Sequence, residues 1–134
     1  MAKTGKLRKV LIVEDDALLA AALVAAFTDA RVRDVRSCAS TAEAMAEIGT
    51  FAPQVLVLDV HLADRSDGWS LAELAQQLFD RAPLIIFSTG SPEAIPEAVR
   101  ALGIVIEKPY SPEALVALAR GKAPRSMLSR LLGT

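Results

Sequence analysis

The stretch Val55 to Asp59 constrains the fold of this chain more than any other. It is a run of apolar, partly β-branched residues that ends abruptly in a carboxylate. Such a run is typical of a strand that is buried on both faces, as in a parallel sheet covered by helices. Asp59 is then expected at the carboxyl end of the strand, the edge at which open α/β sheets place their binding sites.

Three further apolar runs lead into polar residues. They are Val10–Val13 before Glu14-Asp15-Asp16, Leu84–Phe87 before Ser88-Thr89-Gly90, and Ile104–Ile106 before Glu107-Lys108-Pro109. If these runs are parallel strands, their polar residues meet Asp59 at one edge of the sheet. The sequence therefore predicts a cluster of carboxylates with one lysine and one hydroxyl.

Helix signals alternate with these strands. A first helix is expected from Asp15 or Asp16 to about Asp29, and the segment between Arg31 and Cys38 should hold a strand of poor alternation. Further helices are expected from the capping box Ser40–Glu43 to Gly49, from Trp69 to about Phe79, and from Ser111-Pro112-Glu113 onward. Pro92 and Pro96 predict a short or irregular fourth helix. Five strands that alternate with five helices indicate an α/β fold with a doubly wound parallel sheet.

Length and charge narrow the classes of protein further. A chain of 134 residues is long enough for one domain with its own core, and the net charge of -1 gives no reason to expect a nucleic-acid partner. The lone Cys38 fits a reducing compartment. The longest uncharged stretch, Ala17 to Thr28, is too short to span a bilayer, and no signal sequence precedes the first strand. We therefore expect a cytoplasmic protein with no membrane partner.

The first predicted helix has an unusual composition, because Ala17 to Phe27 contains no charged or polar side chain. A surface helix normally carries a polar face. We expect the uncovered part of this helix to dock a helical partner protein or to self-associate. An alanine-rich face that tolerates water is the alternative.

The predicted cluster has the chemistry of a phosphoryl-transfer site. Glu14, Asp15 and Asp59 offer the oxygen ligands that Mg²⁺ prefers, and Asp59 is also a candidate nucleophile, since carboxylates form aspartyl-phosphates. Lys108 offers a positive charge to a phosphoryl oxygen, and Thr89 offers a hydroxyl. Each residue alone is as well explained by a helix cap or a turn, so the prediction depends on their joint order along the strands.

In this order the residues from Leu7 to Arg120 resemble the receiver domain of bacterial two-component response regulators. The resemblance implies a flavodoxin-like sheet of strand order 2-1-3-4-5. It also implies that Glu14 and Asp15 bind the metal, that Asp59 is the phosphoacceptor, and that Thr89 is the switch hydroxyl. Lys108 matches the family's lysine and is followed by a cis-favouring proline. The phosphoryl donor would be a phosphohistidine on a sensor kinase or phosphotransfer protein, and we expect this helical partner to dock on the first helix.

The chain departs from the usual receiver pattern at several positions. Val105 stands where most receivers carry an aromatic switch residue, three positions before the lysine. The sequence Phe87–Gly90 instead is similar to the single-domain Phe-Ala-Thr-Gly-x-Tyr subfamily, with Pro92 in place of the tyrosine. We expect phosphorylation to order the segment 88–100. The same resemblance implies that His61 and Ser91 flank the phosphoryl site and tune the lifetime of the phosphoryl group. The alternative for His61 is that it is an exposed loop residue with no role.

The leading interpretation is a stand-alone receiver domain, residues 1–120, that takes a phosphoryl group onto Asp59 with Mg²⁺. It would relay the signal by phosphotransfer or by phosphorylation-gated binding, and it would catalyse only its own phosphorylation and dephosphorylation. Residues 121–134 form a basic tail that is too short for an output domain. Two alternatives remain: a phosphorylation-independent binding module, and a Mg²⁺-dependent phosphatase. Haloacid-dehalogenase-like phosphatases usually show Asp-x-Asp after the first strand, whereas this chain has Glu14-Asp15-Asp16.

Overall fold

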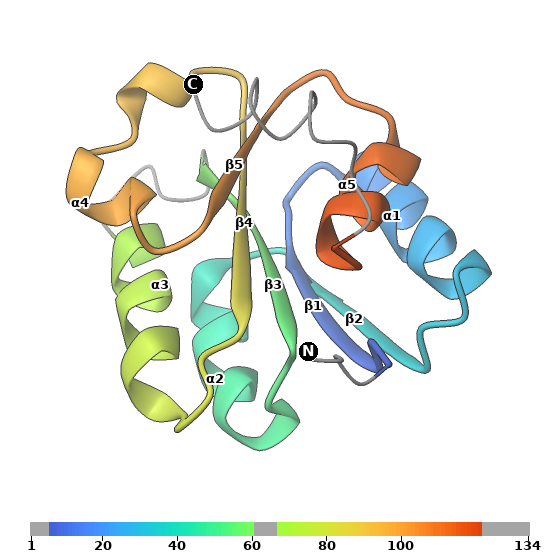
Figure 1. Ribbon diagram of the computed structural model, residues 1–134, viewed down its shortest axis with the longest axis horizontal. Coiled ribbons are helices and arrows are strands. Elements are labelled where there is room, and N and C mark those ends of the chain that lie inside the picture. The colour runs from blue at the N-terminus through green and yellow to red at the C-terminus, as the bar shows by residue number, and fades with distance from the viewer. Residues whose placement is uncertain (1–5, 61–66, 122–134) are drawn as a thin grey trace.

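The apolar runs of the sequence form one parallel sheet of five strands in the order β2-β1-β3-β4-β5 (Figure 1). The computed structural model describes residues 6–60 and 67–121. The strands are β1 (Lys9–Val13), β2 (Asp34–Cys38), β3 (Val55–Asp59), β4 (Leu84–Thr89) and β5 (Ile104–Glu107). The predicted strand order is thus confirmed, including β2, whose alternation is poor because it is an edge strand with three exposed residues.

The central strand β3 is buried along its whole length. It lies between β1 and β4, with Val13 opposite Leu58 and Asp59 opposite Ser88 in the two registers. Because all five strands are parallel, their carboxyl ends share one edge of the sheet. The register therefore brings the residues that follow β1, β3, β4 and β5 to the same end of the molecule.

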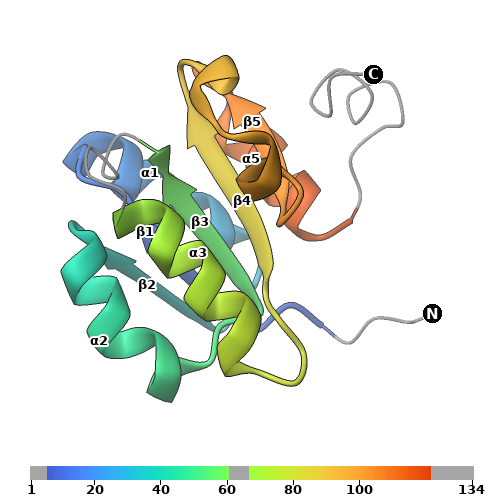
Figure 2. The ribbon, with the colours of Figure 1, turned by 90° about the vertical axis from the view of Figure 1, so that its left-hand side faces the viewer.

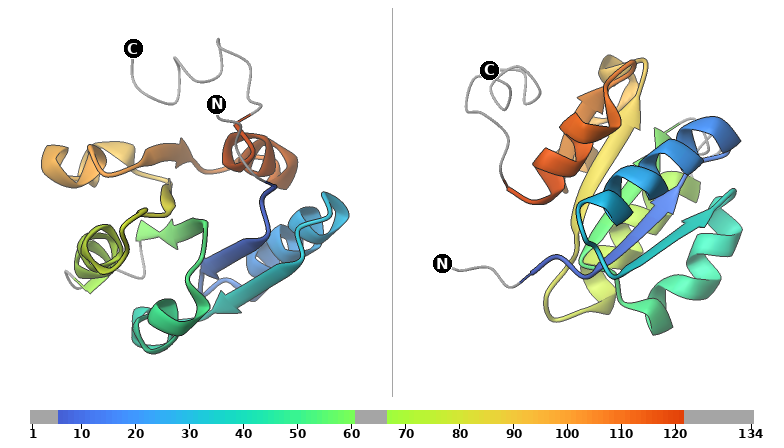
Figure 3. Two further views of the ribbon diagram at one scale, coloured as in Figure 1. Left: turned by 60° about the horizontal axis from the view of Figure 1, so that its bottom comes forward. Right: turned by 90° about the vertical axis from the view of Figure 1, so that its right-hand side faces the viewer.

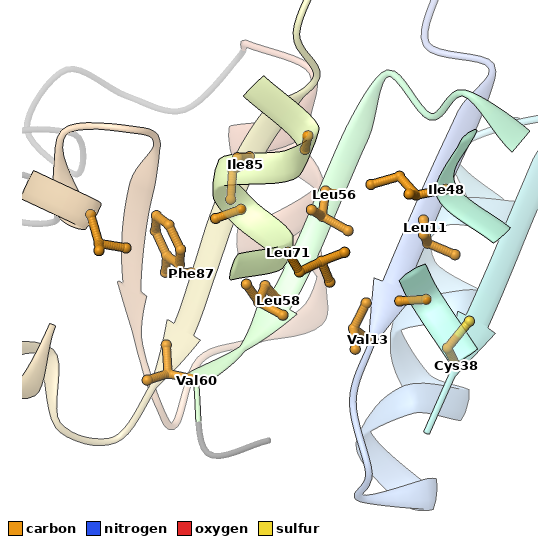
Figure 4. Close-up of a cluster of buried hydrophobic side chains, with 14 of the residues drawn as sticks. Leu11, Val13, Cys38, Ile48, Leu56, Leu58, Val60, Leu71, Ile85 and Phe87 are labelled. Carbon is orange, nitrogen blue, oxygen red and sulfur yellow. The ribbon is translucent and has the colours of Figure 1, made fainter. Parts of the chain in front are cut away.

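Helices cover both faces of the sheet, as Figures 2 and 3 show. On one face lie α2 (Thr41–Phe51) and α3 (Asp67–Leu78), and on the other lie α1 (Ala17–Asp29) and α5 (Pro112–Ala119) side by side. Ile48 of α2 and Leu71 of α3 pack on Leu56, Leu58 and Phe87 of the sheet (Figure 4). A second core cluster joins α1 and α5 to the opposite face of the same strands. Both faces being covered explains the continuous apolar composition of the inner strands.

The predicted helix starts are confirmed where a capping side chain marks them. The Asp16 carboxylate accepts hydrogen bonds from the backbone N–H of Leu18 at 3.0 Å and of Leu19 at 3.2 Å. Ser40 caps α2 and Ser111 caps α5 in the same way. Such caps satisfy backbone donors that have no partner within the helix.

Two predicted helix boundaries were wrong. The second helix does not stop at Gly49 but continues to Phe51, and Ala52 then takes a left-handed conformation with φ of 52°. Phe51 is buried, and burial of a phenylalanine outweighs the cost of about 1 kcal/mol for glycine inside a helix. The third helix begins at Asp67, two residues before the predicted Trp69.

The fourth helix is short and irregular, as the two prolines predict. A 3-10 turn, η2 (Pro92–Ala94), is followed by α4, which extends only from Glu97 to Arg100. Pro96 occupies the position before the first helical residue, where its missing N–H costs nothing. The guanidinium of Arg100 donates a hydrogen bond to the carbonyl oxygen of Pro92, so a single side chain links the two short helices.

Two predictions concern residues that the structure does not describe. His61 and residues 122–134 of the basic tail lie outside the described residues. Within the described part of the chain, no helix combines the length and the apolar character needed to cross a membrane.

Candidate functional site

Three carboxylates converge at the carboxyl edge of the sheet. Glu14 and Asp15 follow β1, and Asp59 ends β3. Each offers an oxygen such that the three atoms lie within 4.8 Å of one another. Glu14 is 3% exposed and Asp59 2% exposed, whereas Asp15 is open to solvent. The structure thus brings together the three residues that the sequence predicts as metal ligands.

Backbone contacts fix Glu14 at this edge. Its N–H donates to the carbonyl oxygen of Cys38 at 3.0 Å, which continues the pairing of β1 with β2. Its carboxylate accepts a hydrogen bond from the N–H of Asp16 at 3.0 Å. Asp16 itself caps α1, so the turn that starts the helix also orients the Glu14 side chain.

The Lys108 ammonium lies between the two buried carboxylates. Its Nζ atom is 3.3 Å from Oε1 of Glu14 and 3.5 Å from Oδ1 of Asp59. The backbone N–H of Lys108 donates to the carbonyl oxygen of Thr89 at 2.7 Å, and the peptide bond to Pro109 is cis. Burial by itself lowers the pKa of Lys108, but the charges of Asp59 and Glu14 outweigh burial and raise it above the usual value.

Burial and the neighbouring Asp59 disturb the ionisation of Glu14. Burial raises the pKa of Glu14 from 4.5 to about 7, with a further contribution from Asp59, while the backbone N–H of Asp16 and the charge of Lys108 oppose the shift. One lysine therefore does not compensate the negative charge of this cluster. Oxygen donors, close spacing and uncompensated negative charge fit a hard divalent cation such as Mg²⁺.

Thr89 ends β4, and Ser91 follows it two residues later at the same edge of the sheet. Thr89 is buried at the end of β4, and its hydroxyl oxygen accepts a hydrogen bond from the N–H of Ser91 at 2.9 Å. Val105 is buried in the core on the same face as Phe87. The position that is aromatic in most receivers is therefore a buried valine in this chain.

Sequence reasoning missed one polar contact beside this site. The hydroxyl groups of Ser88 and Tyr110 are 2.8 Å apart, on the face of the sheet covered by α1 and α5. The only available signals were a tyrosine directly after Lys108-Pro109 and a serine directly before Thr89. Neither signal predicts a contact without the register of β4 and β5.

Comparison with known proteins supports the same family. The response regulator receiver domain family matches residues 10–120 of this chain. No curated protein sequence matches the chain.

Similar solved structures agree in fold. A two-component response regulator from Clostridium difficile is 21% identical with a TM-score of 0.72, covering 86% of this chain and 94% of the other. Chemotaxis response regulator CheY4 of Vibrio cholerae is 23% identical with a TM-score of 0.71, covering 87% and 99%. A putative response regulator from Chloroflexus aurantiacus is 25% identical with a TM-score of 0.65, covering 96% and 100%. With the family match over residues 10–120, this chain belongs to the response regulator receiver domain family.

Proposed function

We propose that this receiver domain accepts a phosphoryl group from a phosphohistidine onto Asp59 and so relays a two-component signal. The observation that carries the proposal is the geometry around Asp59. A buried carboxylate lies within reach of two other acids and of the Lys108 ammonium at 3.5 Å. Family membership supports the class of donor, because receiver domains work with histidine kinases or phosphotransfer proteins.

In the proposed reaction a carboxylate oxygen of Asp59 forms a bond to phosphorus as the bond between phosphorus and the donor imidazole nitrogen breaks. The electron pair of that bond returns to the imidazole. Glu14, Asp15 and Asp59 would hold Mg²⁺, which would supply positive charge to the phosphoryl oxygens. In this proposal the chain catalyses only its own phosphorylation and its own dephosphorylation, in which water releases the phosphoryl group from Asp59 as phosphate.

The Lys108 ammonium and the Thr89 hydroxyl would bind the phosphoryl oxygens. The Lys108 ammonium now contacts Glu14 and Asp59, and a phosphoryl group on Asp59 offers it a more strongly charged partner in the same place. The Thr89 hydroxyl already accepts a hydrogen bond from the Ser91 N–H, which leaves its proton free to be donated. Phosphorylation would therefore form new contacts with the end of β4 and affect the segment that follows it.

The exposed face of α1 is the proposed docking surface for the helical donor. Leu18 is 84% exposed at the start of the helix, next to the acidic site. Ala21, Ala22 and Ala25 are exposed, whereas Leu23 and Phe27 face the core. A donor helix that covers this apolar face would lie beside the carboxyl edge, where its phosphohistidine must reach Asp59.

The test of the phosphoacceptor is labelling by a small phosphodonor such as acetyl phosphate in the presence of Mg²⁺. We expect label on the wild-type chain and none on Asp59→Ala. A label that survives for many minutes would favour a phosphorylation-gated adaptor, and one lost within seconds would favour a phosphate shuttle or sink. No label under any condition would contradict the proposal and favour a phosphorylation-independent binding module.

The test of the docking surface separates the protein donor from the small donor. A charge at Ala21 or Ala25 of α1 should slow phosphorylation by a phosphotransfer protein and leave the rate with acetyl phosphate unchanged. Ala46→Glu on the exposed side of α2 is the matched control and should change neither rate. Equal rates from the protein donor for Ala21→Glu and Ala46→Glu would exclude α1 as the docking surface.

A further inference from the structure

The hydroxyl groups of the buried Ser88 and the partly buried Tyr110 form a pair next to the site. Ser88 has no exposed surface, and its Oγ atom lies 2.8 Å from the Tyr110 hydroxyl. Ser88 precedes Thr89 in β4 and is the register partner of Asp59 in β3. Tyr110 packs with the core cluster between the sheet and the helices α1 and α5. Because Ser88 is buried, removing the Tyr110 hydroxyl would leave the serine hydroxyl without a partner, which is costly.

The pair also holds the residue that carries the positive charge of the site. The segment from Lys108 to Tyr110 is tied to β4 at both of its ends. Its first residue donates a backbone N–H to the carbonyl oxygen of Thr89 at 2.7 Å, and its last residue hydrogen-bonds Ser88. Two consecutive residues of β4 therefore fix the backbone from which the Lys108 side chain reaches Glu14 and Asp59.

We propose that Tyr110 is a positioning residue, whose hydroxyl bond to Ser88 holds the Lys108 ammonium at the carboxylates. This inference rests on the proposed function, in which the Lys108 ammonium binds a phosphoryl oxygen. Val105 is aliphatic and offers no polar contact that could tie β5 to β4 near the switch hydroxyl. The Ser88–Tyr110 bond supplies such a tie on the opposite face of the sheet.

A positioning role and a purely structural role predict different results. If the bond positions Lys108, breaking it frees the ammonium from Glu14 and Asp59, which removes a cation that competes with Mg²⁺ for those oxygens. The affinity for Mg²⁺ then rises while phosphorylation slows. Loss of structure would instead weaken metal binding and slow phosphorylation together.

The experiment compares Tyr110→Phe, Ser88→Ala and the double variant of the full chain. Tyr110→Phe strands a buried serine hydroxyl, so its unfolding equilibrium constant should rise about tenfold, and the double variant should recover most of that loss. In all three variants we expect phosphorylation by acetyl phosphate to slow about tenfold, because the Lys108 ammonium is displaced. We also expect Mg²⁺ to bind about threefold more tightly, because the competing cation has left the carboxylates. Thr50→Val removes a hydroxyl on α2, remote from the site, and should change none of these quantities.

Lys108→Ala supplies the decisive background. If Tyr110 acts through the ammonium, Tyr110→Phe should leave Mg²⁺ affinity unchanged once Lys108 is alanine. An equal effect in both backgrounds would overturn the proposal, and so would a phosphorylation rate that the double variant restores. If the wild-type chain is not labelled at all, the proposed function fails, but the metal-binding comparison still decides whether Tyr110 positions Lys108.

Discussion

Replacing Glu14 by glutamine should stabilise the metal-free protein at alkaline pH. Burial raises the pKa of this carboxyl from 4.5 to about 7, so the folded state holds its proton more tightly than the unfolded chain does. A shift of that size corresponds to about 3 kcal/mol, since each pKa unit is worth about 1.4 kcal/mol. The contribution is fully present below pH 4.5 and is lost as pH rises through 7. Glutamine stays neutral at every pH and keeps an oxygen for the N–H of Asp16.

The assay is urea unfolding in EDTA at pH 5 and pH 8. The difference in unfolding free energy between Glu14→Gln and wild type should grow toward about 3 kcal/mol in favour of the variant as pH rises. Glu73→Gln, an exposed position on α3, is the matched control and should stay within about 0.5 kcal/mol of wild type at both pH values. The pH dependence of the difference isolates Glu14, because all other titrating groups are common to both proteins.

Magnesium should remove most of the variant's advantage in unfolding free energy at pH 8. At about 100 times its dissociation constant, a ligand that binds only the folded state stabilises it by about 2.7 kcal/mol. Wild type should gain this amount at pH 8, whereas Glu14→Gln should gain much less because one ligand has lost its charge. A variant that is less stable than wild type in EDTA at pH 8, or a difference that does not change with pH, would refute the reasoning.

Four further predictions concern the scaffold and the segment that follows β4. A Cβ atom on Gly103 would lie 2.2 Å from the carbonyl oxygen of Ile85, so Gly103→Ala should lower the unfolding free energy by about 2 kcal/mol or more. Gly49→Ala inside α2 should instead raise the unfolding free energy by up to about 1 kcal/mol, because alanine favours the helix and no close contact opposes it. Asp16→Ala should cost about 1 kcal/mol in thermal or urea unfolding, because two N–H groups of α1 lose their acceptor. Hydrogen exchange across residues 88–100 should slow on phosphorylation; exchange that does not change would exclude an order–disorder switch there.

The sequence was sufficient for the parts of the fold that follow a local rule. The run from Val55 to Asp59 predicts a doubly buried strand because a short strand covered on both faces carries continuous, partly β-branched apolar residues. Asp16 and Ser111 predict helix starts because a short polar side chain there satisfies backbone donors. The convergence of Glu14, Asp15 and Asp59 then follows from parallel pairing alone, since the carboxyl ends of parallel strands share an edge.

Features that depend on tertiary contacts were beyond such rules. Gly49 normally ends a helix, but α2 passes through it because Ile48 and Phe51 are both buried. The Ser88–Tyr110 bond joins residues 22 positions apart in sequence, and only the pairing of β4 with β5 brings them together. The raised pKa of Glu14 likewise arises from burial and from Asp59, a neighbour on another strand.

The proposed phosphorylation of Asp59 would require Lys108 to exchange partners. When ionised, Glu14, Asp15 and Asp59 carry three negative charges against the one positive charge of Lys108, and a bound divalent cation would neutralise the remainder. A phosphoryl group on Asp59 would add negative charge to a site whose charges otherwise balance. Lys108 is a described cation already in contact with Asp59, so the new charge would draw its ammonium away from Glu14. Because the backbone of Lys108 is tied to Thr89, any strain from that exchange passes first to the end of β4, from which the short helices η2 and α4 follow.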